Sequence, residues 1–265
     1  MCYDISFKVK LETISDYFPD LIMDDQIDLE FGIRDHIIGH AYGEHPIIYR
    51  SREDHQLHLK LMEWGCIPFY VKDEKAFAKQ RTTMLNARSE RILDDTKSYW
   101  HKIKDRRCLI PLTGTYEHRG IKGWKNKVPY FVKPKNQDMF FLPGLYSVAE
   151  LVNKETGELT KLWTFTLITR DANGAMKNIH NDGDNRWRMP LYLSLDKAKL
   201  WLNEDLNIEN YRMILGYEMP SEELEYYPVF TIRSPKQRPD QKPKYEYWEW
   251  EKLPPLGEMN PDPKV

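Results

Sequence analysis

The hydrophobic and polar positions of the chain alternate in short runs that are typical of β-strands. Apolar residues recur at every second position near the start, from Ile5 to Val9, and again in the run Leu57–Leu61. Two longer runs, Met139–Val152 and Lys161–Thr169, are rich in β-branched and aromatic residues and flank the turn sequence Thr156-Gly157-Glu158. These two runs predict a β-hairpin. Further strands are predicted at 107–117, 128–132, 191–193 and 226–232.

The helical signals are short by comparison. Residues 11–28 mix acidic and apolar positions and predict a helical excursion. Asp171-Ala172-Asn173 can cap a helix that ends near His180, and Ser194 can cap a helix through Leu202. Further helices are predicted at 73–79, 96–104 and 208–215. The pattern as a whole therefore predicts an α+β fold that is mainly antiparallel and β-rich, with short flanking helices.

Composition adds to this picture. The chain holds 16 Tyr, 8 Trp and 17 Pro, which favour a turn-rich β protein over a helical bundle. A formal net charge of -2 supplies no general field for nucleic acid, so any such binding would depend on a local basic patch. With 265 residues and no internal repeat, we expect one domain at 1–232 and a Pro-rich, basic and aromatic tail at 233–265. The tail either packs its rings on the domain or extends a DNA-binding groove.

The three cysteines, Cys2, Cys66 and Cys108, are odd in number and lack the CxxC or Cys/His spacing of a zinc site. This argues against a disulfide framework and a structural metal, and it favours a reducing compartment. The sequence contains neither a transmembrane run nor the apolar segment of a signal peptide. We therefore expect a soluble, cytoplasmic, nucleoid-associated monomer that needs no metal and no cofactor and does not bind membranes.

The first two residues, Met1 and Cys2, carry the most specific chemistry. A start methionine before a small residue is normally removed, which would leave Cys2 with a thiol and a free α-amine on adjacent carbons. Such an amine titrates near ~7.7 and a thiol near ~8.5, so both are partly nucleophilic at neutral pH. The amine can condense with an aldehyde to an imine, and the thiol can then close a five-membered thiazolidine. An aldehyde is therefore the substrate that this pair would capture.

Four further residues, taken one at a time, have ordinary structural explanations. Asn86 and Arg88 could cap and pair within a turn. Glu117 alternates with apolar residues on a predicted strand and could face solvent, and His180 could be a surface histidine at a helix end. Only their combination points to a function.

That combination is an ordered series of motifs that runs from residue 2 to about residue 232. The series resembles the SOS response-associated peptidase (SRAP) family, whose members crosslink covalently to abasic sites in single-stranded DNA. The motifs are Met1-Cys2, Trp64-Gly65-Cys66-Ile67-Pro68, Asn86-Ala87-Arg88-Ser89-Glu90, Arg107-Cys108-Leu109-Ile110-Pro111, Gly114-Thr115-Tyr116-Glu117, Pro143-Gly144-Leu145-Tyr146, and Ala172-Asn173 through His180 to Arg188-Met189-Pro190.

The resemblance implies a β-rich pseudo-barrel and a catalytic set. Cys2 would form the covalent bond as a thiazolidine, and Asn86 would position the N-terminus and the sugar. Glu117 would act as the acid/base, while His180 would assist ring opening and reversal. The implied activity is lyase-like crosslink formation that protects abasic sites during the DNA damage response, with self-reversal.

The resemblance also implies the DNA contacts. Arg88 and Arg188 would bind phosphates, Trp64 would lie in a turn against the lesion, and Met189 and Pro190 would complete the DNA-binding set. The implied partner is single-stranded DNA that contains abasic sites.

Three departures from the family pattern bear on these assignments. The family usually begins Met-Cys-Gly-Arg, whereas residues 1–4 here read Met-Cys-Tyr-Asp, which removes a basic residue beside Cys2. The usual Tyr-Glu-Trp is Tyr116-Glu117-His118. The His-Asp-Arg-Met-Pro run is split, with seven residues between His180 and Arg188.

Two other functions remain open from the residues alone. A cysteine peptidase could use Cys2 as an N-terminal nucleophile, with Glu117 and His180 assisting acyl transfer and autoprocessing. A non-enzymatic module could bind single-stranded DNA by aromatic stacking and basic grooves without forming a covalent bond.

Overall fold

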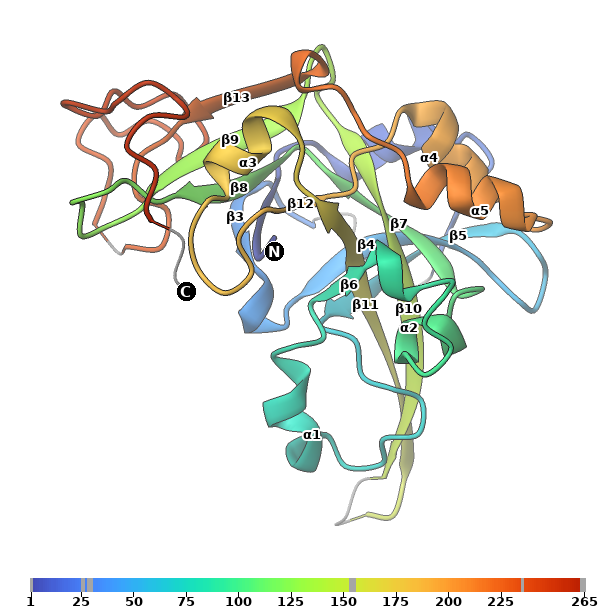
Figure 1. Ribbon diagram of the computed structural model, residues 1–265. Helices are drawn as coiled ribbons and strands as arrows, with labels where there is room; N and C mark the ends of the chain where they lie inside the picture. Colours follow the sequence, from blue (N-terminus) through green and yellow to red (C-terminus); the bar gives the residue numbers. More distant parts are fainter. Residues whose placement is uncertain (1, 25–26, 28–30, 153–155, 235, 263–265) are drawn as a thin grey trace.

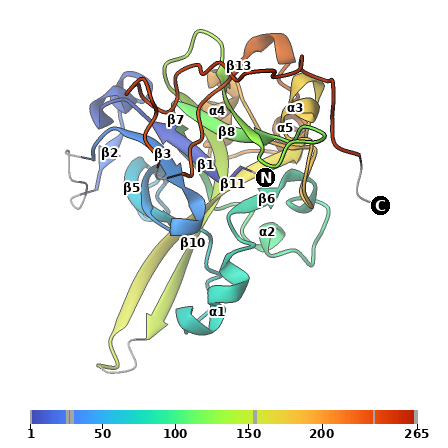
Figure 2. The ribbon, with the colours of Figure 1, turned by 90° about the vertical axis from the view of Figure 1, so that its left-hand side faces the viewer.

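The computed structural model describes residues 2–24, 27, 31–152, 156–234 and 236–262. Within these residues the protein is α+β with strands predominating, as the sequence predicts, and its strands form two sheets (Figure 1). The two strands of the predicted hairpin extend from the body as a long arm beside α1 (Glu74–Arg81), as Figure 1 and Figure 2 show.

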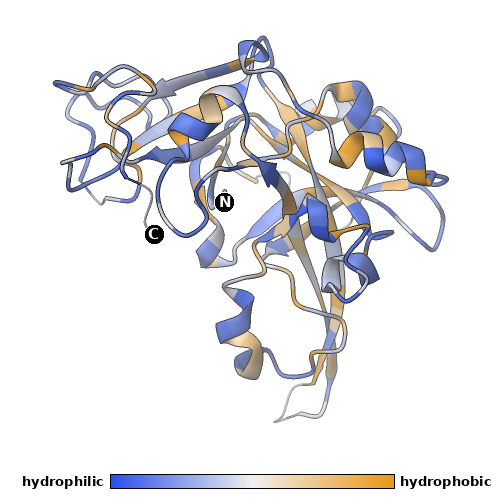
Figure 3. Ribbon diagram, viewed as in Figure 1, coloured by the Kyte–Doolittle hydropathy of each residue, from blue (hydrophilic) through white to orange (hydrophobic). Residues whose placement is uncertain are grey.

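One sheet closes into a barrel of five strands. Antiparallel pairs join β5 (Leu57–Trp64), β4 (Glu44–Arg50), β7 (Arg107–Leu112), β10 (Phe140–Val152) and β11 (Leu159–Asp171) in that order. A parallel pairing between β11 and β5 then closes the ring. Three short strands extend this sheet, namely β2 (Ile22–Met23), β6 (Asn86–Arg88) and β12 (Arg188–Pro190). Figure 3 shows apolar residues along the barrel strands.

The second sheet is antiparallel and has the strand order β13–β9–β8–β1–β3. These strands are β13 (Leu224–Pro228), β9 (Val128–Pro134), β8 (Gly114–Arg119), β1 (Asp4–Phe7) and β3 (Arg34–Ile38). Gly114 starts β8 beneath the ring of Phe131, and a Cβ atom there would lie 1.9 Å from the Phe131 Cζ. Only glycine therefore allows β8 to pass under that ring.

The helices are short and lie around the sheets. They are α1, α2 (Tyr99–Lys102), α3 (Gly174–Ile179), α4 (Leu195–Trp201) and α5 (Ile208–Leu215), with 3₁₀ turns at Leu11–Asp16, Gly39–Ala41, Ser89–Arg91 and Ser221–Glu223. Trp201 fixes α4 to the barrel, because its buried Nε1–H donates to the carbonyls of Cys108 and Gly144 at 3.2 and 3.3 Å. No helix in the described ranges is both long and apolar enough to cross a membrane.

The predicted hairpin is confirmed, since β10 and β11 pair from Gly144–Leu167 to Val152–Leu159. The predicted cap at Ser194 is also confirmed, because its Oγ accepts from the N–H of Lys197. The turn residues 153–155 lie outside the described residues.

Several local predictions are wrong. The single strand expected at 107–117 is two strands in different sheets, broken at Thr113, whose hydroxyl bonds to Ser6 Oγ at 3.0 Å. The excursion at 11–28 is a 3₁₀ turn followed by β2, because Pro19 cannot continue a helix. Of it, residues 25–26 and 28 lie outside the described part. The helix expected at 96–104 covers only Tyr99–Lys102, and 191–193 forms no strand.

The C-terminal segment folds back on the sheets. The Trp248 ring packs against Phe230 at 4.9 Å between centroids, and Trp250 Nε1–H donates to the Val229 carbonyl. Arg119 is fully buried, and its guanidinium donates to backbone carbonyls of the segment at Pro254, Pro255 and Glu258. The rings therefore pack on the body, whereas a domain boundary at residue 232 stays a prediction.

Candidate functional site

Cys2 lies in the interior, just before β1, and is fully buried. The pairing of β1 with β8 explains its place, since Ile5 is opposite Thr115 and the antiparallel register continues toward Cys2 and Glu117. Its thiol donates a weak hydrogen bond to the Asp4 carbonyl, with 3.6 Å between Sγ and O. Burial, followed by the charge of Glu117, raises the pKa of the Cys2 thiol well above its ordinary value. The thiol is therefore protonated at neutral pH.

Asn86 holds the backbone of Cys2. It lies on β6, which pairs in parallel with β11 and places Asn86 opposite Leu167. The Asn86 Nδ2 donates to the Cys2 carbonyl at 2.9 Å, while its buried Oδ1 accepts no hydrogen bond from the residues that the structure describes. One side of the amide thus fixes Cys2 and the other presents an acceptor.

Glu117 is a buried carboxyl group and not a solvent-facing one. It lies on β8 between β9 and β1, and only 2% of the residue is exposed. Burial raises the pKa of Glu117 to about 7. Its Oε2 lies 3.9 Å from the Nε2 of His180, and its Oε1 has no hydrogen-bond partner within the described residues. At neutral pH this carboxyl group can therefore both donate and accept a proton.

His180 ends α3, which packs against β8. The backbone N–H of Arg188 donates to the His180 Nδ1 at 3.2 Å, so the neutral ring carries its proton on Nε2, toward Glu117. Burial lowers the pKa of His180 to about 3, and the ring is neutral under physiological conditions. His180 can therefore offer an N–H donor beside Glu117.

The seven residues between His180 and Arg188 form a loop that is closed at its base. The backbone N–H of Trp187 donates to the His180 carbonyl at 2.7 Å, directly before the bond from Arg188 to the His180 ring. The extra residues therefore project as a loop and leave His180 next to Arg188.

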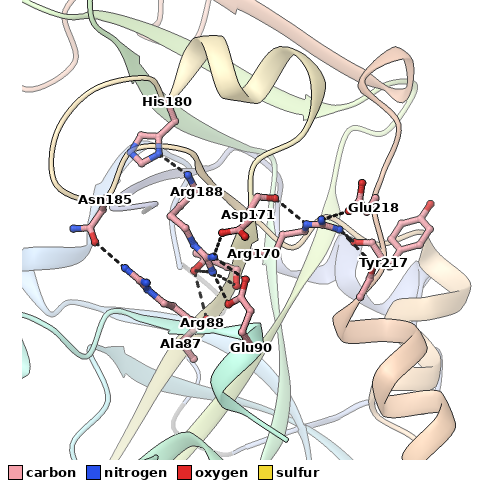
Figure 4. A network of polar contacts seen from close by, with 12 residues as sticks. Ala87, Arg88, Glu90, Arg170, Asp171, His180, Asn185, Arg188, Tyr217 and Glu218 are labelled. Atoms are coloured by element: carbon pink, nitrogen blue, oxygen red, sulfur yellow. Dashed lines mark hydrogen bonds and ion pairs between the residues drawn. The ribbon is translucent and has the colours of Figure 1, made fainter. Parts of the chain in front are cut away.

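The Arg188 side chain is buried in a polar network (Figure 4). Its guanidinium donates to both carboxylate oxygens of Glu90, to Asp171 and to the Thr169 carbonyl. Because these donors are directed to protein acceptors, the structure gives no support to a phosphate contact by Arg188. Arg88, in contrast, is exposed, and its Nη2 donates to Asn185 Oδ1 at 3.4 Å.

Three other residues expected to contact DNA are also buried. Trp64 is 1% exposed, and its Nε1–H donates to the Leu85 carbonyl at 2.9 Å. Met189 and Pro190 belong to β12 and are buried against the barrel. Their side chains pack into the wall behind the site, so the structure gives no support to the expected DNA contacts of these three residues.

One functional candidate was not assigned from the sequence. Arg233 reaches back to Asp4, with its Nε 3.0 Å from Oδ1 and its Nη2 2.6 Å from Oδ2. His36 Nε2 lies 2.8 Å from the same Oδ1. Burial alone would raise the pKa of Asp4, but these bonds hold it below its ordinary value. A half-exposed guanidinium therefore lies beside Cys2, where the sequence departs from the family's basic residue.

No group of three or more His, Cys, Asp or Glu side chains among the described residues is arranged to hold a metal ion. What the arrangement offers is proton transfer: a protonated thiol, a carboxyl group of near-neutral pKa and a neutral imidazole N–H.

Residues 1–232 match the model of the SOS response associated peptidase (SRAP) family, and the chain belongs to this family. It is 33% identical to the abasic site processing protein YoaM of Bacillus subtilis over 176 residues, which are 66% of this chain and 70% of that protein. It is also 28% identical to the abasic site processing protein HMCES of Gallus gallus over 190 residues, covering 64% of this chain and 52% of that protein.

Solved structures share the fold. A protein from Bacteroides thetaiotaomicron superposes with a TM-score of 0.69 at 28% identity, over 86% of this chain and 92% of that one. A protein from Bordetella bronchiseptica superposes with a TM-score of 0.66 at 18% identity, over 87% of this chain and 100% of that one, which shows the fold alone.

The burial of Glu117 predicts a pH-dependent stability. A folded-state pKa of about 7 against an ordinary value of 4.5 means that ionisation costs more in the folded state. The wild type should therefore lose up to about 3 kcal/mol of unfolding free energy, relative to Glu117→Gln, as pH rises from about 4.5 to about 7. Chemical denaturation of both proteins across this range measures the difference. Glu222→Gln, at an exposed position, is the matched control. If the unfolding free energies of Glu117→Gln and wild type stayed parallel across this pH range, the raised pKa of Glu117 would be contradicted.

Proposed function

We propose that this protein processes abasic sites by forming a covalent bond between Cys2 and the sugar of an abasic site in single-stranded DNA. The observation that carries this proposal is that the buried Cys2 lies beside Glu117, whose carboxyl group has a pKa of about 7. Family membership and relatives that are named abasic site processing proteins support it.

The proposed reaction has two covalent steps once Met1 has been removed. The α-amine of Cys2 attacks the aldehyde of the opened sugar, and loss of one water molecule gives an imine. The thiol then adds across the C=N bond: sulfur bonds to carbon, and the proton lost by sulfur is balanced by the proton gained by nitrogen. The product is a thiazolidine, and the two reaction steps need no oxidant or reductant.

Glu117 is proposed to move the protons. As a carboxylic acid it protonates the hydroxyl that leaves as water, and as a carboxylate it accepts the proton of the thiol. The raised pKa of the Cys2 thiol fits this order, because the thiol would release its proton only when the S–C bond forms. Asn86 is proposed to hold Cys2 through its carbonyl. His180 is proposed to donate its Nε2–H to the sugar oxygen during ring opening and reversal.

The site favours this chemistry over acyl transfer. A cysteine peptidase needs a thiolate that is activated by a base, usually histidine. Here burial raises the pKa of the Cys2 thiol, while the Nδ1 of His180 accepts from Arg188 and its Nε2 is directed to Glu117. No observation at the site favours a peptidase.

Replacement of Cys2 tests the function directly. Cys2→Ala should abolish the denaturant-resistant adduct with single-stranded DNA in which a glycosylase has converted uracil to an abasic site. A denaturing gel measures it. Cys66→Ala, at an equally buried cysteine, is the matched control and should retain the adduct. An adduct of undiminished yield with Cys2→Ala would refute the proposal, and binding that is lost in denaturant with every variant would leave only a non-covalent binding module.

Two kinetic measurements separate the roles of Glu117 and His180. Glu117→Gln keeps the shape but cannot transfer a proton, so adduct formation should slow by about 10²-fold or more. His180→Ala should slow both adduct formation and transfer of the protein to a competing abasic strand, with little change in DNA affinity. The time courses of formation and transfer measure both. Unchanged rates for His180→Ala would make His180 a structural residue.

Salt dependence separates the two arginines. Arg88→Ala should weaken binding to single-stranded DNA and reduce the slope of log K against log salt by about 0.7, since one phosphate contact is lost. Arg188→Ala should leave the slope unchanged and lower the melting temperature instead, because its guanidinium bonds link Glu90, Asp171 and Thr169. A reduced slope for Arg188→Ala with an intact slope for Arg88→Ala would reverse the assignment.

A further inference from the structure

A cavity of about 730 Å³ opens beside the site, under the loop that separates His180 from Arg188. Basic side chains dominate its lining, with Arg88, Lys177, Arg186 and Arg188 set against Asp171 and Asp184. Since Arg188 is already bound to protein carboxylates and the Arg186 guanidinium lies over the Trp187 ring, Arg88 and Lys177 are the cations that could meet a phosphate there. The cavity therefore combines positive charge with two lining residues, Trp187 and Arg188, whose backbone N–H groups donate to His180.

Trp187 is the large aromatic residue of this lining, and 45% of it is exposed. Its φ is 62°, in the left-handed region that bulky residues rarely adopt because it strains the backbone. Two backbone bonds hold it there: its N–H donates to the His180 carbonyl, and its carbonyl accepts from the Ala172 N–H, each at 2.7 Å. The exposed indole therefore stands on a fixed backbone, where glycine would be less strained.

The indole also carries a cationic neighbour, since the Arg186 guanidinium lies 4.6 Å from its ring centroid. An aromatic ring flanked by basic side chains is the usual platform on which single-stranded nucleic acid stacks a base. An abasic nucleotide has no base of its own, so aromatic contacts can only be made to its neighbours. A platform tied to the His180 backbone would hold the neighbouring base in a fixed relation to the reacting sugar.

We propose that Trp187 stacks on the base next to the abasic site, while Arg88 and Lys177 bind the flanking phosphates. Because this role rests on the function proposed above, binding is best measured on a lesion that cannot react. DNA that contains tetrahydrofuran, a stable abasic analogue without an aldehyde, separates strand binding from crosslinking.

The experiment compares wild type, Trp187→Gly and Trp187→Phe on two single strands. Glycine tolerates the positive φ and removes the ring, whereas phenylalanine keeps a ring. One strand has a single tetrahydrofuran residue between normal nucleotides, and in the other the neighbouring bases are removed as well. Tyr247→Ala removes a similarly exposed ring that does not line the cavity and serves as the control.

Wild type should lose about tenfold in affinity when the neighbouring bases are removed, and Trp187→Gly should lose about tenfold on the first strand. Trp187→Gly should bind both strands alike, and Trp187→Phe should keep most of the difference. Equal affinities of wild type and Trp187→Gly, or equal weakening on both strands, would overturn the role of Trp187. If wild type formed no adduct with authentic abasic DNA, the proposed chemistry would fail while the stacking result stood independently.

Discussion

The carboxyl group of Glu117 is held in the interior by the pairing of β8 with β9 and β1, and burial brings its pKa to about 7. The rest of the site depends on this placement. The same sheet brings Cys2 alongside through β1, and α3 packs on β8 so that the His180 Nε2 lies 3.9 Å from the Glu117 Oε2. If Glu117 were solvated, its pKa would return toward its ordinary value, and little of it could donate a proton at neutral pH.

A second constraint is the positioning of His180 by the residues that follow it. Backbone bonds from Trp187 and Arg188 fix both its carbonyl and its ring tautomer. Arg188 is fixed in turn by Glu90, Asp171 and Thr169, which connects the histidine to β11, β12 and the 3₁₀ turn Ser89–Arg91. The sequence of the loop can therefore vary, outside the residues that make these bonds, without displacing His180.

Local patterns predicted much of the fold but not its closure. The β10–β11 hairpin was predictable because two long β-branched runs flank a short turn. The barrel closes through a parallel pairing of β5 with β11, about a hundred residues apart, and no local pattern encodes that contact. The break at Thr113 escaped prediction because residues 107–117 are apolar enough to read as one strand in either sheet.

The candidate site was predictable as a set of motifs, whereas the burial of each side chain was not. Trp64 and Arg188 are residue types that suit DNA contact. In the structure, however, Trp64 packs against the barrel and Arg188 forms ion pairs inside the protein. The pairing of Arg233 with Asp4 joins residues far apart in the sequence, and it brings a guanidinium to a place where residues 1–4 have no basic side chain. Trp187 had no sequence signal beyond its place in a polar loop, because its backbone conformation is visible only in the structure.

The most direct measurement of the central claim is peptide mapping of the DNA adduct by tandem mass spectrometry after nuclease and protease digestion. The proposed chemistry predicts that the peptide beginning at Cys2 carries the sugar remnant with the loss of one water molecule. It also predicts that the thiol of that peptide accepts no alkylating label and that its nitrogen, now a secondary amine in the ring, does not react with a reagent specific for primary amines. A sugar remnant on a lysine, or a modified Cys2 peptide that still reacts as a primary amine or a free thiol, would contradict the thiazolidine.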